Sequence, residues 1–263
     1  MIYTHNIDPV IFSIGFIDLY WYGAMYAISF LIVDHMMKAN YFNLNIYNLS
    51  NTQIDKVLLI SLVSLLVGGR LGYVLFYNLN FYLMFPIKTF FIWEGGMSFH
   101  GALLGVIFAV FWLRKLIDVN FLQLTDFIVI YVPVGLFFGR LGNFINSELY
   151  GAPTNSSWGI IFPILDNIPR HPSMLYEAVL EGIVLFIILL FLSRKYINTP
   201  GFLTSIFLIF YSIFRFIVEF VRVPDSHIGY LWGDWLTMGQ LLSVPMVFFG
   251  VLLLFNINRS ELT

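Results

Sequence analysis

The sequence predicts an all-α fold: a polytopic integral membrane protein with seven transmembrane helices, its N-terminus outside and its C-terminus in the cytoplasm. Composition is the first observation behind this prediction. Of 263 residues, 59% are hydrophobic and 11% are charged, whereas a soluble domain has about 45–50% apolar and about 25% charged residues. The other two observations are a series of long apolar runs and the placement of lysine and arginine between them.

Each long apolar run is a candidate for one helix, because a helix that crosses a bilayer needs roughly 20 mostly apolar residues. The third run reaches this length only if the preceding FFIW contributes. The first run is too long for a cleavable signal peptide and lacks a basic segment before it. In chain order the predicted spans are Ile17–Met37, Val57–Tyr77, Phe99–Leu113, Phe127–Leu141, Met174–Leu192, Phe202–Val221 and Thr237–Phe255.

Lysine and arginine predict the orientation, because they are enriched on the cytoplasmic side of membrane proteins. The first 18 residues contain neither. An outside N-terminus and seven spans put the following residues inside: Lys38, Lys56, Arg114, Lys115, Arg194, Lys195 and Arg259. The outer segment 142–172 contains Pro, Asn and Gly throughout, and we expect it to form a small extracytoplasmic cap. No internal repeat or linker is visible, so residues 1–263 are predicted to be a single membrane domain.

Composition also excludes several kinds of chemistry. The chain has no cysteine, which rules out disulfides and a cysteine nucleophile. If a thiol takes part in the chemistry of this protein, the substrate must supply it. A net charge of −2 gives no signal for a nucleic-acid partner. The five histidines are isolated and match no metal-ligand spacing, so we expect no metal. No phosphate-loop or dinucleotide fingerprint is present, and we expect no cofactor.

Polar residues from five predicted spans share one depth, near the outer face. At 1.5 Å per residue, Arg70, Arg140, Arg215, His100 and Tyr22 all fall there. An arginine at the centre of a membrane helix costs at least about 2.5 kcal/mol, so each of the three needs a partner. The block GRLGNFINSELYG, residues 139–151, adds further polar side chains at the end of the fourth span.

The sixth span supplies some partners for these arginines. In FRFIVEFVRVPD, Arg215, Glu219 and Arg222 fall at i, i+4 and i+7, so Glu219 lies within reach of both arginines. The positive charge of the arginines still exceeds the negative charge of Glu148 and Glu219. An anionic ligand would restore the balance, and at this depth a phospholipid phosphate fits, because arginine binds phosphate through a bidentate fork.

Simpler interpretations stand beside this one. Each arginine taken alone can reach the interface by extending its side chain. Glu177 and Glu181 are expected to satisfy polar groups in helix packing. Ser98 is a potential helix cap before His100. The glycines in GGRLG, residues 68–72, are expected to permit close helix packing.

The chain resembles the prolipoprotein diacylglyceryl transferase family, integral enzymes of the bacterial inner membrane. GRLGNFINSELYG resembles the signature of that family. The resemblance extends through DPVIFSIG, WYGAMY, GGRLGYVLFYN, WEGGMSFHG, RHPSMLYE, FRFIVEFVRVPD and MGQLLSVPM. These eight blocks occur in order over essentially the whole chain. The departures lie between Gly151 and Arg170, where the family varies in length.

The resemblance implies a reaction, a location and partners. The family transfers the diacylglyceryl group of phosphatidylglycerol to the lipobox cysteine of an exported prolipoprotein and releases glycerol phosphate. The implied location is the bacterial inner membrane, with the active site towards the periplasm and the lipid bilayer as a further partner. Matching motifs imply catalytic roles for His100, Arg140, Glu148, Arg215 and Glu219, and substrate binding by Arg140, Arg215, Tyr22, Asn143 and Gly151. The shared depth and charge add Asn146, Arg70 and Arg222 to the substrate-binding set.

The thiol of the substrate cysteine has a pKa of about 8.5 and must lose its proton before it can attack. His100 is one candidate base, and Glu148 or Glu219 are others unless they orient the arginines. Two rival functions remain open at this stage. A phospholipid transporter or flippase would also carry intramembrane charge, although the charges cluster on one side. A lipid-binding scaffold would explain the arginines but not His100.

Overall fold

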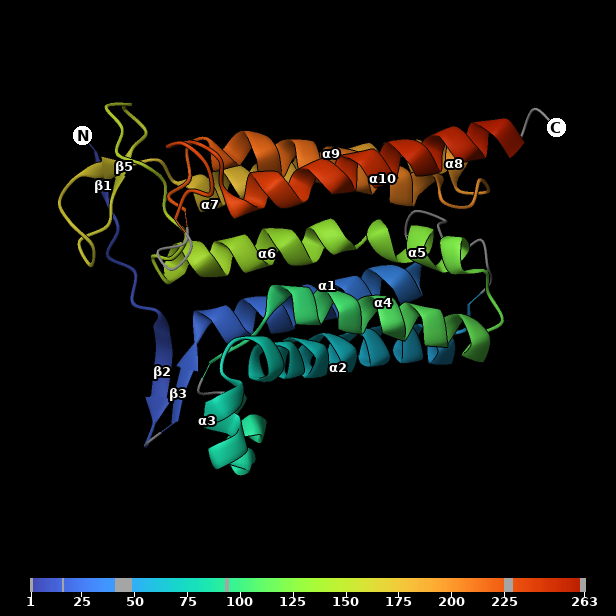
Figure 1. Ribbon diagram of the computed structural model, residues 1–263, viewed down its shortest axis with the longest axis horizontal. Coiled ribbons are helices and arrows are strands. Elements are labelled where there is room, and N and C mark those ends of the chain that lie inside the picture. Colours follow the sequence, from blue (N-terminus) through green and yellow to red (C-terminus); the bar gives the residue numbers. More distant parts are fainter. Residues whose placement is uncertain (1, 16, 41–48, 93–94, 225–228, 261–263) are drawn as a thin grey trace. The chain divides into compact units, whose positions relative to one another are not determined.

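The computed structural model describes residues 2–15, 17–40, 49–92, 95–224 and 229–260, and these residues are mostly helical (Figure 1). Two compact units result: residues 1–36 with 126–263, and residues 37–125. The all-α prediction needs one correction, because short strands form outside the helices. A helix satisfies its backbone hydrogen bonds internally and therefore suits the bilayer. These strands belong instead to segments that connect or precede the helices.

The first unit begins with strands. β1 (Tyr3–Thr4) pairs in parallel with β4 (Ile160–Ile161), which pairs antiparallel with β5 (Pro169–Arg170). β2 (Val10–Ile14) and β3 (Ile17–Tyr20) form an antiparallel hairpin. The first predicted span is therefore wrong at its start, because its first four residues are strand. The helix α1 (Trp21–Ala39) follows them.

The fourth predicted span is a bent pair of helices. α5 (Phe121–Val129) and α6 (Val132–Ile145) meet at an angle of 42°. Pro133 lies in the first turn of α6. Proline lacks the backbone N–H that would continue the preceding helix, but it fits the first turn of a new one. The bend therefore has a local cause in the sequence. Residues 142–145, the first of the predicted cap, form the last turn of α6.

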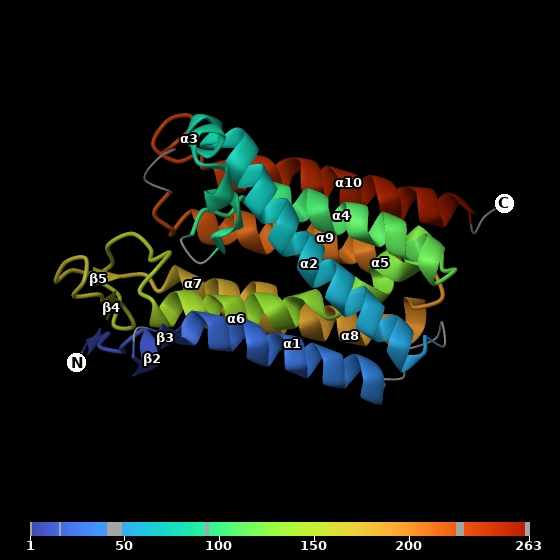
Figure 2. The same ribbon diagram turned by 90° about the horizontal axis from the view of Figure 1, so that it is seen from below.

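The fifth predicted span is continuous but changes its helical period. It runs as α7 (Ser173–Glu177), the π-helix η3 (Ala178–Val184) and α8 (Leu185–Tyr196). The sixth span is α9 (Phe202–Glu219), and the seventh is α10 (Met238–Ser260). Figure 2 shows α6 and α7 side by side, and Figure 1 shows the same of α9 and α10.

The second unit is built on a close helix pair. α2 (Asn51–Phe76) starts with a capping box between Ser50 and Gln53, six residues before the predicted span. α4 (Phe99–Leu116) packs against α2 through glycines: a Cβ on Gly72 would lie 2.7 Å from the Cα of Gly101. The prediction of close packing at these glycines is confirmed. In chain order, α2 and α4 are connected through the short helix α3 (Leu79–Met84) and the 3₁₀ helix η1 (Pro86–Phe90).

Four helices in the described part of the chain are long and apolar enough to cross a membrane: α2, the α7–α8 helix, α9 and α10. The bent α5–α6 pair makes five if it counts as one span. The protein is therefore a membrane protein with four or five candidate spans by length and composition. The two remaining predicted spans coincide with α1 and α4.

Candidate functional site: an arginine–glutamate cluster at the end of α6

The polar block at the end of α6 folds into one hydrogen-bonded chain. Arg140 and Asn143 lie on adjacent turns, and Asn143 Oδ1 accepts a hydrogen bond from Arg140 Nη1 at 3.4 Å. Asn143 Nδ2 donates to one oxygen of Glu148 at 3.0 Å, and Asn146 Nδ2 donates to the other at 3.3 Å. A tight turn with positive φ at Ser147 and Leu149 brings Glu148 back towards the helix. The four polar residues of the block thus lie together.

Glu177 joins Arg140 to Arg215. Its Oε1 accepts a hydrogen bond from Arg215 Nη1 at 2.5 Å, while Arg140 Nε lies 2.7 Å from its Oε2. The N–H of Arg140 does not point along that line, so this second contact is an ion pair without hydrogen-bond geometry. Glu181 lies farther away, 3.6 Å from Arg140 Nη2 and 3.9 Å from Arg215 Nη1. Both carboxylates are fully buried.

Glu219 completes the cluster from the other side. Arg215 Nη2 lies 2.7 Å from its Oε1, and Arg222 Nη1 lies 3.5 Å from the same oxygen. The predicted reach of Glu219 to both arginines is confirmed. Its other oxygen accepts a 2.6 Å hydrogen bond from the Thr237 hydroxyl, just before α10. A Cβ on Gly239 would meet the carboxyl carbon of Glu219 at 2.6 Å, so α10 approaches this closely because Gly239 has no side chain.

The predicted excess of positive charge is wrong. Arg140, Arg215 and Arg222 face three buried carboxylates, those of Glu177, Glu181 and Glu219. Glu177 and Glu181 satisfy polar groups between packed helices, as expected, and those groups are the guanidiniums of the arginines. Two glutamates one turn apart in an otherwise apolar helix were the available signal. A charged pair in such a helix is costly unless it faces opposite charge.

Tyr22 and Gly151 border this cluster. The ring of Tyr22 lies against Gly142, whose Cβ would be 2.8 Å from the ring. Its hydroxyl is 3.1 Å from that of Tyr26. Gly151 donates its N–H to the carbonyl of His171 at 2.8 Å and forms an antiparallel bridge with Arg222. Both predicted residues thus lie beside elements that hold the arginines.

Arg70 belongs to the second unit and has local partners there. Its guanidinium donates to the carbonyl oxygens of Lys88, Thr89, Phe91, Gly95 and Gly96. These five bonds match the five N–H donors of a guanidinium. The structure therefore shows Arg70 binding both η1 and residues that follow it. His100 is the second residue of α4, but its side chain lies outside the described residues. Ser98 caps α4 as predicted, accepting from the N–H of Gly101.

Segment 142–172 has a small buried core of its own. Ile160 and Phe162 of this segment form it with Met174 of α7. His5 is buried against the rings of Phe144 and Phe162, and burial lowers its pKa below the usual range. Further out, a hydrogen bond from Arg170 lowers the pKa of Asp166.

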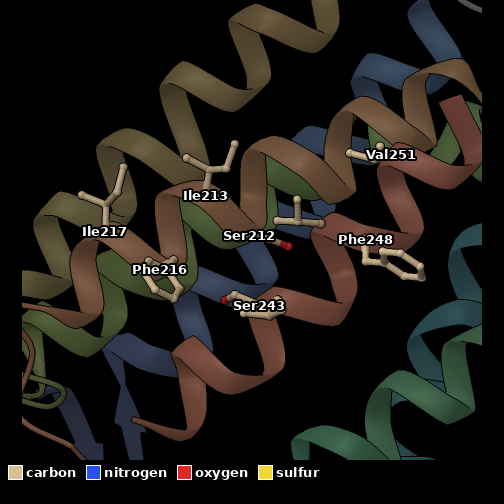
Figure 3. A pocket seen from close by; sticks show the side chains of 9 residues that line it. Ser212, Ile213, Phe216, Ile217, Ser243, Phe248 and Val251 are labelled. Atoms are coloured by element: carbon tan, nitrogen blue, oxygen red, sulfur yellow. The ribbon is translucent and has the colours of Figure 1, made fainter. Parts of the chain in front are cut away.

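A separate apolar groove lies between α9 and α10. Its volume is about 490 Å³, and Figure 3 shows Ser212, Phe216, Ser243, Phe248 and Val251 along it. The lining is hydrocarbon apart from two serines, and none of the charged residues of the cluster is part of it. Such a lining suits an apolar guest better than a charged headgroup.

Comparison with known proteins gives a consistent result. The model of one family, described as prolipoprotein diacylglyceryl transferase, matches residues 9–256. A phosphatidylglycerol–prolipoprotein diacylglyceryl transferase of Methylococcus capsulatus is 45% identical over 249 residues, 94% of each chain. The protein of the same name in Pseudomonas paraeruginosa is 47% identical over 262 residues, covering 97% of this chain and 96% of that one. That of Geobacter sulfurreducens is 45% identical over 256 residues, 97% of each chain.

Proposed function

The chain belongs to the prolipoprotein diacylglyceryl transferase family, and on that premise we propose that it transfers the diacylglyceryl group of phosphatidylglycerol to the lipobox cysteine of an exported prolipoprotein. The observation that carries the proposal is the buried cluster in which Arg140 and Arg215 both contact Glu177. Nothing in the described residues favours the transporter or scaffold interpretations.

The chemistry of this transfer suits paired arginines. The cysteine thiolate attacks the glyceryl carbon that bears the phosphate; a C–S bond forms, the C–O bond breaks, and glycerol phosphate leaves with the bonding electrons. The carbon is sp³, so no oxyanion hole is needed. Negative charge grows on the departing phosphate oxygen, and guanidinium groups fixed beside it stabilise that charge.

The predicted site residues are proposed to have different roles. Arg140 and Arg215 bind the phosphate, with Asn143, Asn146 and Glu148 holding Arg140 in place. Glu219 orients Arg215 and Arg222, since it pairs with both. Tyr22 and Gly151 shape the border of the site. His100 and Glu148 remain the candidates that accept the thiol proton. Arg70 remains a proposed substrate-binding residue from the sequence, and its partners in the structure are backbone carbonyls of its own unit.

We further propose that residues 1–263 act as one membrane domain with seven spans in the bacterial inner membrane. The N-terminus and the cap at 142–172 face the periplasm, and the C-terminus faces the cytoplasm. Support comes from the lysine and arginine distribution in the sequence. A periplasmic site suits a substrate that arrives by export.

A reconstituted assay tests the reaction. Purified protein is mixed with phosphatidylglycerol and a lipobox peptide, and the peptide mass and released glycerol phosphate are measured. We expect a diacylglyceryl mass gain that R140A lowers by about 10²–10³-fold, because one preorganised donor group to developing charge is lost. R140K keeps the charge but loses the fork and is expected to be nearly as impaired. The matched control is R194A, since Arg194 is exposed at the far end of α8.

Full activity in R140A at normal protein levels would refute the assignment of Arg140. A folded wild-type protein that modifies no peptide with several anionic lipids would refute the transfer itself, and movement of intact labelled lipid would then be measured.

A further inference from the structure

Glu177 occupies the centre of the cluster. Its side chain is fully buried. One oxygen contacts Arg215 at 2.5 Å and Arg222 at 3.4 Å, and the other contacts Arg140 at 2.7 Å. A single carboxylate therefore lies between guanidiniums from α6 and α9. Of the three glutamates in the cluster, Glu177 has short contacts to both of the proposed phosphate-binding arginines.

Two guanidiniums at this spacing repel each other, and each side chain has a large number of rotamers. A carboxylate between them offsets the repulsion and fixes the distance between the two groups, because one oxygen accepts a hydrogen bond from Arg215 and the other forms an ion pair with Arg140. Arg140 Nε and Arg215 Nη1 are the nitrogens used. Each guanidinium has five N–H donors, so both keep donors for a second anion while Glu177 holds them.

The backbone beneath Glu177 is fixed on both sides. Ser173, at the start of α7, donates its hydroxyl hydrogen to the carbonyl of Leu149 in the signature turn at 2.7 Å. One turn beyond Glu177, a Cβ on Gly182 would lie 2.7 Å from the Cβ of Phe137, so η3 and α6 are in close contact there. The π-helical turn begins at Ala178, directly after Glu177. Short π-helical segments often occur at functional sites. Glu177 thus has little freedom to follow a displaced arginine.

We propose that Glu177 is a positioning residue for diacylglyceryl transfer: it holds Arg140 and Arg215 at the separation at which both meet the phosphate that leaves. The inference rests on the proposed function, because it assigns how that site is held together. Glu181 has the same charge and burial but lies at 3.6 Å and 3.9 Å from these arginines. It contributes charge balance without fixing the geometry.

The test compares two glutamates and two replacements in the reconstituted assay. E177Q removes the negative charge and replaces one of the two oxygens that contact the arginines. E177D keeps the charge, but its side chain is too short to reach both arginines. We expect kcat to fall by about 10²-fold in both, because a misplacement of about 1 Å at a reacting centre has an effect of that size. The KM for phosphatidylglycerol should change by less than about threefold, since the arginines still attract the anion. E181Q, the matched control for charge and burial, should lose less than about tenfold.

Three results would overturn the inference: wild-type kcat in E177Q, restoration of kcat by E177D, or equal losses in E177Q and E181Q. The second and third would make total charge, and not geometry, the important quantity. Thermal unfolding in detergent checks that each variant is folded, and E177D decides the matter if E177Q does not fold. Wild-type protein is run in parallel: if it modifies no peptide, the proposed function fails, whereas normal wild-type turnover with unaffected variants refutes only the role of Glu177.

Discussion

Gly151 illustrates how a residue without a side chain belongs to the site. A Cβ there would lie 2.5 Å from the carbonyl oxygen of Val221 and 2.7 Å from both the Cβ and the carbonyl oxygen of His171. Two of these atoms are backbone and cannot rotate away. Its φ is not in the left-handed region, so the need for glycine here is steric. The chain crosses between β5 and the end of α9 at this point, next to the backbone of Arg222.

The substitution G151A is therefore expected to lower the free energy of unfolding by about 1–3 kcal/mol, the usual cost of overpacking. Activity should fall as well, because the shifted segment carries Arg222. Thermal unfolding in detergent and the transfer assay measure both effects. G135A is the matched control: a Cβ at Gly135 meets nothing within 4 Å. If G151A unfolds at the same temperature as the wild type, the steric account is wrong.

At the scale of elements, the start of α9 shows how distant segments fix a helix. Asp126 of α5 is fully buried and accepts hydrogen bonds from the backbone N–H groups of Gly201 and Thr204 and from the Thr204 hydroxyl. A carboxylate from another helix thus caps α9. The same α9 carries Arg215 and Glu219 at its other end. The position of Asp126 at the start of α9 therefore contributes to the position of the arginine–glutamate cluster at the other end of this helix.

The substitution D126A removes the carboxylate that caps the N-terminus of α9. We expect it to lower the free energy of unfolding by about 1–3 kcal/mol, because buried N–H donors lose their acceptor. Thermal unfolding in detergent measures the loss. T204V, which removes one of the three hydrogen bonds and leaves the two backbone bonds, should lose less. An unchanged unfolding temperature in D126A, or a larger loss in T204V, would contradict the capping role.

At the scale of the whole molecule, one candidate spanning helix makes the proposed orientation testable. The helix Ser173–Tyr196 separates the cap from the loop before α9, and 24 residues at about 1.5 Å each suffice to cross a bilayer. The chain has no cysteine of its own. A single cysteine introduced on either side therefore reports its position without background.

We expect S157C in the cap to react with a membrane-impermeant maleimide in intact spheroplasts, and N198C to react only after permeabilisation. Both positions are exposed. The cysteine-free parent protein is the control for background labelling. Labelling of both positions from the same side would refute the span between them, and the reverse pattern would refute the proposed orientation.

The sequence determined the class of the molecule and most of its helices. Apolar runs of helical length depend on composition alone, so the segments at 202–221 and 237–255 correspond to α9 and α10. The spacing of Arg215 and Glu219 fixed their common face, because residues i and i+4 are neighbours on an α-helix. Arg222 also reaches Glu219, but it lies beyond the end of α9 in a bridge with Gly151. The polar block at 139–151 indicated a site, because polar residues at the end of an apolar run need polar partners.

Only the tertiary structure decided which charges meet. Arg70 and Arg140 looked equivalent by depth, yet Arg70 binds backbone carbonyls in its own unit while Arg140 pairs with Glu177. The strand β1 depends on pairing with β4, a distant segment that local pattern does not record. Glu177 and Glu181 gained their role when Gly182 allowed η3 to approach α6. Ion pairing between helices acts over a few ångströms in space and is independent of separation along the chain, so a single sequence does not specify it.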